Sequence, residues 1–229
     1  MEFDYYYNNV PGDGLCRNNL IYTSLMSKDQ KTFCQWYYND PVYHKKENQV
    51  VDPALMNEKW ARELCYLNFM ATHYPDLVPE IKEIDLINKK IYLKVDGPDF
   101  WQQALDMGGF QKVLPDWEEQ MLNIFKAHKE SGLWKFSLHP SSYFVVDGKL
   151  KSINYFFCHG AEDKPFSLQD VESHIYVTRQ EILKGVMKKL GYAWDQKLPF
   201  HKVQRLALES FRVNFPDSFT DKAIDLLDV

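Results

Sequence analysis

The sequence has few cysteines, no clustered histidines and no long apolar run. The four cysteines are scattered, without a C-x-x-C or similar spacing, which argues against a zinc site or a disulfide framework. Among the cysteines and the seven histidines, Cys158-His159 comes closest to a pair of metal ligands. A zinc site needs three or four ligands, so no metal site is expected. No stretch of about 18 apolar residues occurs, and no transmembrane helix is expected.

An excess of basic residues is also lacking. The 229 residues include 27 basic and 32 acidic side chains, a net charge of −5. Without a basic stripe to replace counterions, a nucleic-acid partner is not expected. The first residues, "MEFDYYYNNV", lack the basic and apolar regions of a signal peptide. We therefore expect a soluble, cytoplasmic protein with no membrane partner.

The first part of the chain has strand patterns around one helix. Runs rich in β-branched and aromatic residues at 20–26 and 32–38 flank a polar turn and predict a hairpin. A second hairpin is predicted over 80–95, around the turn "INKK". Between the hairpins, residues 40–53 are expected to form a loop. The helix predicted over 57–74 has Asn57 as its N-cap and one apolar stripe, formed by Trp60, Leu64, Leu67 and Ala71.

Beyond the break signal Asp96-Gly97-Pro98, helical patterns dominate. Helices are predicted over 99–107 and 115–132, and Asp147-Gly148 between apolar runs predicts a hairpin. A capping box at 178–181 precedes another helix, and two more are predicted over 201–213 and 221–228. This order predicts an α+β fold of two lobes: residues 1–96, an antiparallel sheet plus one helix, and residues 97–229, mainly helical.

The stretch "KFSLHPSSYF" (135–144), followed by a hairpin and "INYFF", resembles the protein-kinase-like superfamily. The pattern is most similar to the aminoglycoside and choline phosphotransferases, which carry H-x-D-L-H-P-x-N-I-L-V, a hairpin and then I-D-F or D-F-G. The resemblance covers nearly the whole chain by element order, but it reaches motif level only over 128–157. The matching residues are Leu138, His139, Pro140, Val145, Val146, Ile153 and Phe156.

The resemblance implies three working positions, and neutral residues occupy all of them. Ser137 stands where the loop aspartate orients and deprotonates the acceptor hydroxyl. Ser142 and Asn154 stand where an asparagine and an aspartate hold magnesium. A serine is no base near neutral pH, and neutral oxygens replace anionic magnesium ligands poorly. Lys135 stands at the position of the usual histidine. Its side chain could place a positive charge near the phosphate region of such a site or extend to solvent, and we expect the latter.

In the N-terminal lobe, the resemblance places Gln35 at the position of the strand lysine and Glu63 at that of its helix partner. A hydrogen bond between Gln35 and Glu63 is the expected substitute for that ion pair, although Glu63 also reads as a solvated helix carboxylate. Candidate cofactor-binding residues are Gly12 and Gly14, in "GDGLCRNN", and Asp96 and Gly97, between the lobes. Gly12 and Gly14 are also typical of an ordinary turn.

Three functions stay open from the sequence. The first is a pseudokinase, a binding or regulatory module with an unidentified protein or small-molecule partner. The second is an atypical ATP-dependent phosphotransferase acting on a small molecule, in which Asp147, Glu162 or Asp163 supplies the missing acid. The third is an unrelated α+β interaction protein. The missing base and magnesium ligands favour the first, so no enzyme activity and no cofactor are expected, with ATP and magnesium left open.

Overall fold

The computed structural model divides into two compact units, residues 1–117 with 140–156 and residues 118–139 with 157–229. It describes residues 1–6, 21–40, 42, 52–135, 139–160, 180–193, 196–199, 202, 205, 206, 208, 209, 212, 218 and 219. Six of the residues singled out above lie outside these ranges: Gly12, Gly14, Ser137, Leu138, Glu162 and Asp163. The lobe boundary expected between residues 96 and 97 stays a prediction.

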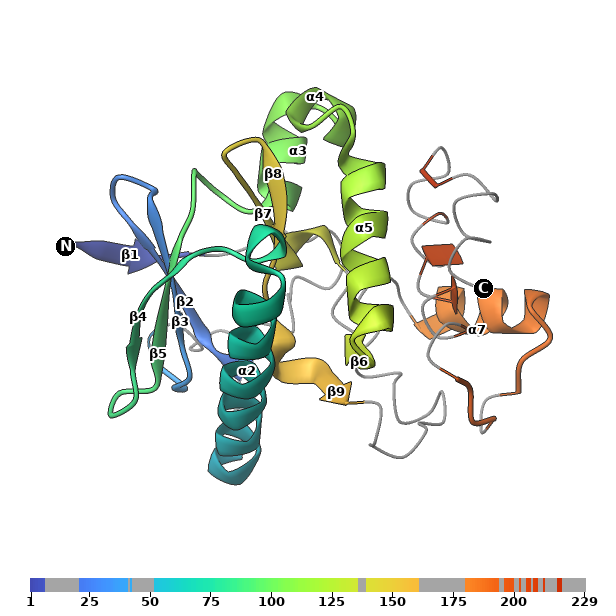
Figure 1. The fold of residues 1–229 in the computed structure, drawn as a ribbon, viewed down its shortest axis with the longest axis horizontal. Helices are drawn as coiled ribbons and strands as arrows, with labels where there is room; N and C mark the ends of the chain where they lie inside the picture. The colour runs from blue at the N-terminus through green and yellow to red at the C-terminus, as the bar shows by residue number, and fades with distance from the viewer. Residues whose placement is uncertain are drawn as a thin grey trace. The chain divides into compact units, whose positions relative to one another are not determined.

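The first unit contains a five-stranded antiparallel sheet in the order β1-β2-β3-β5-β4 (Figure 1). Its strands are β1 (Phe3–Tyr5), β2 (Thr23–Ser27), β3 (Thr32–Trp36), β4 (Ile81–Asp85) and β5 (Lys90–Lys94). Both predicted hairpins form, and the short edge strand β1 is added to them. The predicted α+β class is confirmed.

Helix α2 (Pro53–His73) begins four residues earlier than predicted. The Asp52 side chain, not that of Asn57, caps it by accepting a hydrogen bond from the Ala54 N–H at 2.8 Å. Pro53 suits the first turn, where its missing N–H leaves no partner unsatisfied. Asn57 instead accepts a hydrogen bond from the Lys89 ammonium, in the β4–β5 turn. Of the expected stripe, Trp60 and Leu67 are buried, whereas Leu64 and Ala71 are half-buried.

The rest of the first unit packs helices and a hairpin around aromatic side chains. Helices α3 (Phe100–Met107) and α4 (Phe110–Val113) bring Phe110 against Phe100 and Trp117, with ring centroids 4.9 Å apart in both pairs. The predicted hairpin forms as β7 (Tyr143–Val146) and β8 (Lys149–Ser152). The Phe144 ring lies 5.0 Å from that of Phe33 in β3. Lys151 donates to the Asp76 carbonyl in the short helix η1 (Pro75–Leu77) at 2.6 Å.

The second unit holds most of helix α5 (Trp117–Glu130), the pair β6 (Leu133–Lys135) and β9 (Cys158–Gly160), and helix α7 (Gln180–Lys189). The predicted face of α5 is buried; it comprises Trp117, Met121, Ile124, Phe125 and His128. The β6–β9 pair was not predicted, because three-residue strands carry too little alternation to detect. The helices expected over 201–213 and 221–228 lie largely outside the described residues, as does the first half of the capping box.

The expectation that the Lys135 side chain extends to solvent is wrong, because this side chain is buried. Burial, and after it the positive charge of Lys135, lowers the pKa of the equally buried His128 to about 3. Burial likewise lowers the pKa of His139 to about 4. Both imidazoles are therefore neutral near pH 7.

In the part of the chain that the structure describes, no helix has the length and apolar character needed to cross a membrane.

Asp99 ties the end of β1 to helix α3. Its carboxylate caps the helix by accepting the Gln102 N–H at 3.0 Å, and it accepts the Tyr6 hydroxyl at 2.7 Å. Burial raises the pKa of the Asp99 carboxyl to about 7. The protonated form is therefore favoured in the folded state relative to the unfolded chain.

Replacing Asp99 with Asn is expected to remove one component of the pH dependence of stability, so that the difference in unfolding free energy between the variant and the wild type changes with pH. Since the folded-state pKa lies above the ordinary value of about 3.9, the contribution of Asp99 to stability falls between about pH 4 and pH 7 and levels off above that, whereas the lowered pKa values of His128 and His139 make their contributions rise with pH in both proteins. The neutral amide of Asp99→Asn does not titrate, so this fall disappears. Urea denaturation at a series of pH values measures the effect. Parallel curves for the wild type and the variant would show that Asp99 does not titrate in this range.

Candidate functional site

Asn154 lies at the centre of a buried hydrogen-bond network in the first unit. Its amide oxygen accepts the Tyr22 hydroxyl at 2.7 Å and the Gln35 amide N–H at 2.9 Å. Its own amide N–H donates to the Ser142 hydroxyl at 2.8 Å. None of these four side chains is more than 1% exposed. Three of the predicted site residues, Gln35, Ser142 and Asn154, therefore meet in one network.

The local backbone explains how the hairpin carries Ser142 and Asn154 to the same place. Ser142 ends the short helix η2 (Pro140–Ser142) before β7, and Asn154 follows β8. The Ile153 N–H donates to the Ser142 carbonyl at 2.9 Å, which extends the pairing of the hairpin. Asn154 has a φ of 68°. Asparagine adopts this left-handed conformation more readily than most residues.

Glu63 lies on the buried face of α2, so its reading as a solvated carboxylate is wrong. Its carboxylate accepts the backbone N–H of Phe156 at 2.7 Å, two residues beyond Asn154. Burial, and after it the nearby Glu63 carboxylate, raises the pKa of the Tyr37 phenol. The expected Gln35–Glu63 hydrogen bond does not form, because the Gln35 amide is engaged by Asn154 and a backbone N–H reaches Glu63 instead.

The network does not fit a magnesium ion. The Asn154 oxygen already accepts two hydrogen bonds, and the Ser142 hydroxyl is engaged by Asn154. Both groups are neutral, whereas magnesium is held in phosphotransfer sites through one or two carboxylates. Among the described residues, no group of three or more His, Cys, Asp or Glu side chains could hold a metal ion.

Asp96 and Gly97, the described candidates for cofactor binding, are engaged elsewhere in the first unit. The Asp96 carboxylate pairs with the Lys31 ammonium at 2.9 Å and accepts the Asp147 backbone N–H at 3.0 Å. The hydrogen bond from the Lys31 ammonium is the main cause that lowers the pKa of Asp96. The Gly97 N–H donates to the Gln30 carbonyl at 2.9 Å. This segment therefore fastens the β2–β3 turn and the β7–β8 turn to the end of β5, and its Gly97 donor is used within the chain.

Tyr22 is the network member that the sequence did not reveal. It lies in an apolar run and reads as an ordinary core aromatic, and its ring does pack edge-on against Phe156, with centroids 5.8 Å apart. Only the hydroxyl takes part in the site. Its partner Asn154 lies 132 residues away along the chain, and no local pattern links the two.

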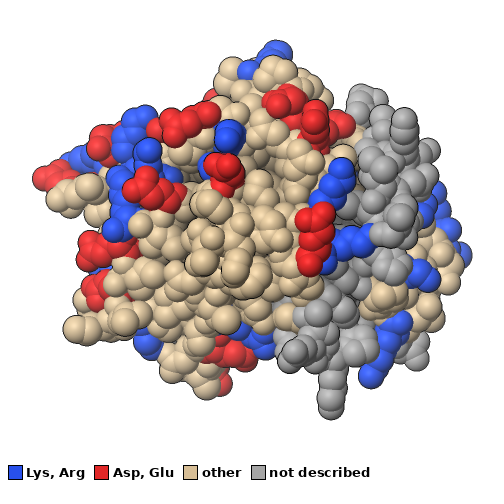
Figure 2. Space-filling view, viewed as in Figure 1, with Lys and Arg blue, Asp and Glu red and all other residues tan. Residues whose placement is uncertain are grey.

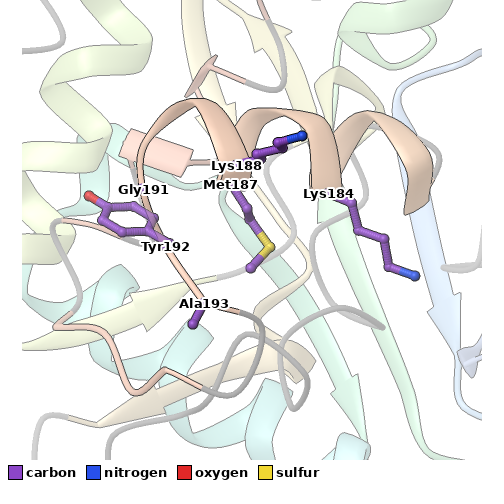
Figure 3. Close-up of a pocket in the computed structure, with 6 residues that line it drawn as sticks. All are labelled: Lys184, Met187, Lys188, Gly191, Tyr192 and Ala193. Carbon is purple, nitrogen blue, oxygen red and sulfur yellow. The ribbon is translucent and has the colours of Figure 1, made fainter.

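A hollow of about 490 Å³ lies beside α7 in the second unit, and none of the predicted site residues is among the described residues that line it. Its lining residues are Lys184, Met187, Lys188, Gly191, Tyr192 and Ala193 (Figure 3). The Lys202 ammonium lies 6.0 Å from the centre of the Tyr192 ring. The described lining residues thus include apolar side chains and two lysines, and none of them is an acid.

A five-stranded antiparallel sheet, a helix with a buried glutamate and a short loop leading into a hairpin make this a kinase-like fold. A 2.2 Å crystal structure of WbdD aligns with 100% of this chain and 49% of its own, with a TM-score of 0.50 and 9% identity. A medium-resolution structure, described as the bifunctional kinase-methyltransferase WbdD, aligns with 100% of this chain and 50% of its own, with a TM-score of 0.47 and 11% identity.

The chain thus spans about half the length of these structures, and at such identities the likeness concerns the fold alone. No family model and no curated protein matches the sequence. At the level of the fold, this likeness agrees with the resemblance found in the sequence.

Proposed function

We propose that this chain is a cytoplasmic pseudokinase-type module that binds or regulates a protein or small-molecule partner. The observation that carries the proposal is the network around Asn154. Residues at three kinase-motif positions, Gln35, Ser142 and Asn154, bond to one another in the protein interior, and a fourth, Glu63, holds the adjacent backbone.

Phosphoryl transfer depends almost entirely on positioning and on stabilising the charge of the phosphates. A magnesium–nucleotide complex at this network would have to displace the bonds from Tyr22 and Gln35 to the Asn154 oxygen. It would gain only neutral oxygens in return. The same side chains instead stabilise the fold. Their hydrogen bonds hold the β7–β8 hairpin to β3 and to Tyr22, the residue that precedes β2.

The alternative is an atypical ATP-dependent phosphotransferase acting on a small molecule. The observation in its favour is Asp147, whose side chain is 78% exposed at the β7–β8 turn, 3.9 Å from the Lys94 ammonium. An accessible acid beside a cation could orient a hydroxyl group and a phosphate. The buried state of Ser142 and Asn154 favours the pseudokinase over this alternative.

Magnesium and ATP are expected to leave the melting temperature of the full chain unchanged. A ligand at a hundred times its Kd adds about 2.7 kcal/mol, which for this chain length corresponds to roughly 5–10 °C. Thermal melts with ATP, with and without magnesium, and with magnesium alone provide the comparison. A shift that requires both would contradict the proposal. ATP consumption that disappears in Asp147→Asn would establish the alternative.

A further inference from the structure

Two polar atoms in the interior of the first unit are not explained by the bonds described above. Among the described residues on the face shown in Figure 2, acidic and basic side chains are interspersed, so that face carries no block of one sign. In the interior, by contrast, Gln35 Oε1 and the Tyr37 hydroxyl are buried and form no hydrogen bond with another atom of the protein. Such atoms are rare in folded proteins, and a bound water is a common explanation.

The orientation of the Gln35 amide is fixed by its partner. Its Nε2 donates to the Asn154 oxygen at 2.9 Å, and that oxygen also accepts the Tyr22 hydroxyl at 2.7 Å. An amide turned by half a rotation would place Oε1 against the Asn154 oxygen, and two acceptors would then face each other. Gln35 Oε1 therefore needs a donor other than Asn154.

The Tyr37 hydroxyl is held in place because its ring is packed against two others. The ring centroid lies 5.6 Å from that of Tyr22 and 5.3 Å from that of Trp60 in α2. Tyr37 is buried, so bulk solvent does not reach the hydroxyl. The ring cannot turn toward a new partner without breaking this close packing. The hydroxyl therefore needs an acceptor at the place where it lies.

The two atoms lie on the side of the sheet that faces α2, where Glu63 is buried. Residues 35 and 37 are two apart on an extended chain, whose pairing continues because the Tyr37 N–H donates to the Lys89 carbonyl at 3.0 Å. Their side chains therefore share a face. The Glu63 carboxylate is close enough to Tyr37 to raise its pKa. One oxygen of this carboxylate, Oε2, accepts the Phe156 N–H at 2.7 Å, and the other, Oε1, is also buried.

A single water molecule matches the hydrogen-bonding needs of these groups. Water donates two hydrogen bonds, here to Gln35 Oε1 and to the Glu63 carboxylate, and it accepts one from the Tyr37 hydroxyl. Three polar partners are typical of a buried water. A metal ion would contact the same oxygens, but it would leave the hydroxyl hydrogen of Tyr37 without an acceptor. The chemistry of the three side chains therefore favours water over a cation.

We propose that a water molecule is bound between Gln35, Tyr37 and Glu63 and that it joins β3 to α2. This bridge takes the place of the direct hydrogen bond between Gln35 and Glu63 that the sequence predicted. It concerns the protein without a nucleotide and does not depend on the proposed function.

A high-resolution crystal structure of the full chain tests the proposal directly. We expect a density peak at about 2.7–3.2 Å from Gln35 Oε1, from the Tyr37 hydroxyl and from a carboxylate oxygen of Glu63, the range of hydrogen bonds. The lack of a peak there overturns the proposal, and so does a direct hydrogen bond between two of the three side chains. A peak at about 2.0–2.6 Å from the oxygens marks a metal ion and also overturns it.

Tyr37→Phe tests in solution whether the bridge stabilises the fold. The variant keeps the packed ring but removes the hydroxyl, so the water loses one of its three partners. The equilibrium constant for unfolding, measured by urea denaturation, is expected to rise about fivefold or more. Tyr38→Phe is the matched control, because the neighbouring Tyr38 is 47% exposed, and it should change the constant by less than about twofold. An effect of Tyr37→Phe no larger than that of the control overturns the proposal.

Discussion

Replacing Asn154 with Leu is expected to lower the free energy of unfolding by about 3–5 kcal/mol, among the larger effects of a single substitution. The change removes the partner of three buried polar groups, those of Tyr22, Gln35 and Ser142. An unsatisfied buried donor or acceptor costs about 1–3 kcal/mol. The left-handed backbone at residue 154 adds to the loss, because leucine adopts it less readily than asparagine. Urea denaturation measures the difference.

Two further variants separate these causes. Asn154→Gly removes the side chain but accepts the positive φ, so it is expected to retain most of the loss. Asn68→Leu, on the exposed face of α2, is the control and should change stability by less than about 0.5 kcal/mol. If Asn154→Leu falls within the range of the control, the network does not hold the first unit together.

Replacing Glu63 with Leu is expected to cost about 2–3 kcal/mol, because the buried N–H of Phe156 loses its acceptor. Glu63→Gln retains a side-chain oxygen at the same reach and should cost less than half as much. Hydrogen exchange provides a local readout: the Phe156 amide is expected to exchange faster in Glu63→Leu and to stay protected in Glu63→Gln.

The comparison of the two variants distinguishes the role of Glu63 seen here from that in an active kinase. There the glutamate serves as the partner of a lysine, and its charge is essential. Here the structure assigns it the role of acceptor for a backbone N–H. Equal losses of stability in Glu63→Gln and Glu63→Leu would mean that the negative charge of Glu63, not its accepting oxygen, stabilises the fold.

The elements that the sequence predicted well are those fixed by local signals. Asp147-Gly148 specifies the β7–β8 turn, where both residues have positive φ, and the three- and four-residue spacing of apolar side chains specifies the buried face of α5. The start of α2 was misplaced although its signal, Asp52-Pro53, is also local. The polar residues 40–53 favour a loop that ends at Pro53, whereas Pro53 is the first residue of the helix.

The candidate site was predictable only in part. The motif positions of Gln35, Ser142 and Asn154 follow from the resemblance, but their hydrogen bonds do not. The bond between Gln35 and Asn154 joins residues 119 apart in the sequence, and its existence depends on how the hairpin packs on the sheet. The burial of Lys135 was missed for the same reason, since strand β9, which pairs with the strand carrying it, is too short to recognise in the sequence.

The most direct test is a crystal structure of the protein soaked with manganese and a non-hydrolysable ATP analogue. Manganese substitutes for magnesium and is located by its anomalous scattering. We expect no metal peak at Asn154 and an unchanged set of bonds from Tyr22 and Gln35 to its oxygen. A peak at about 2.1 Å from the Asn154 oxygen, the distance of direct ligation, with Tyr22 and Gln35 displaced, would contradict the view that these side chains have replaced the phosphotransfer site.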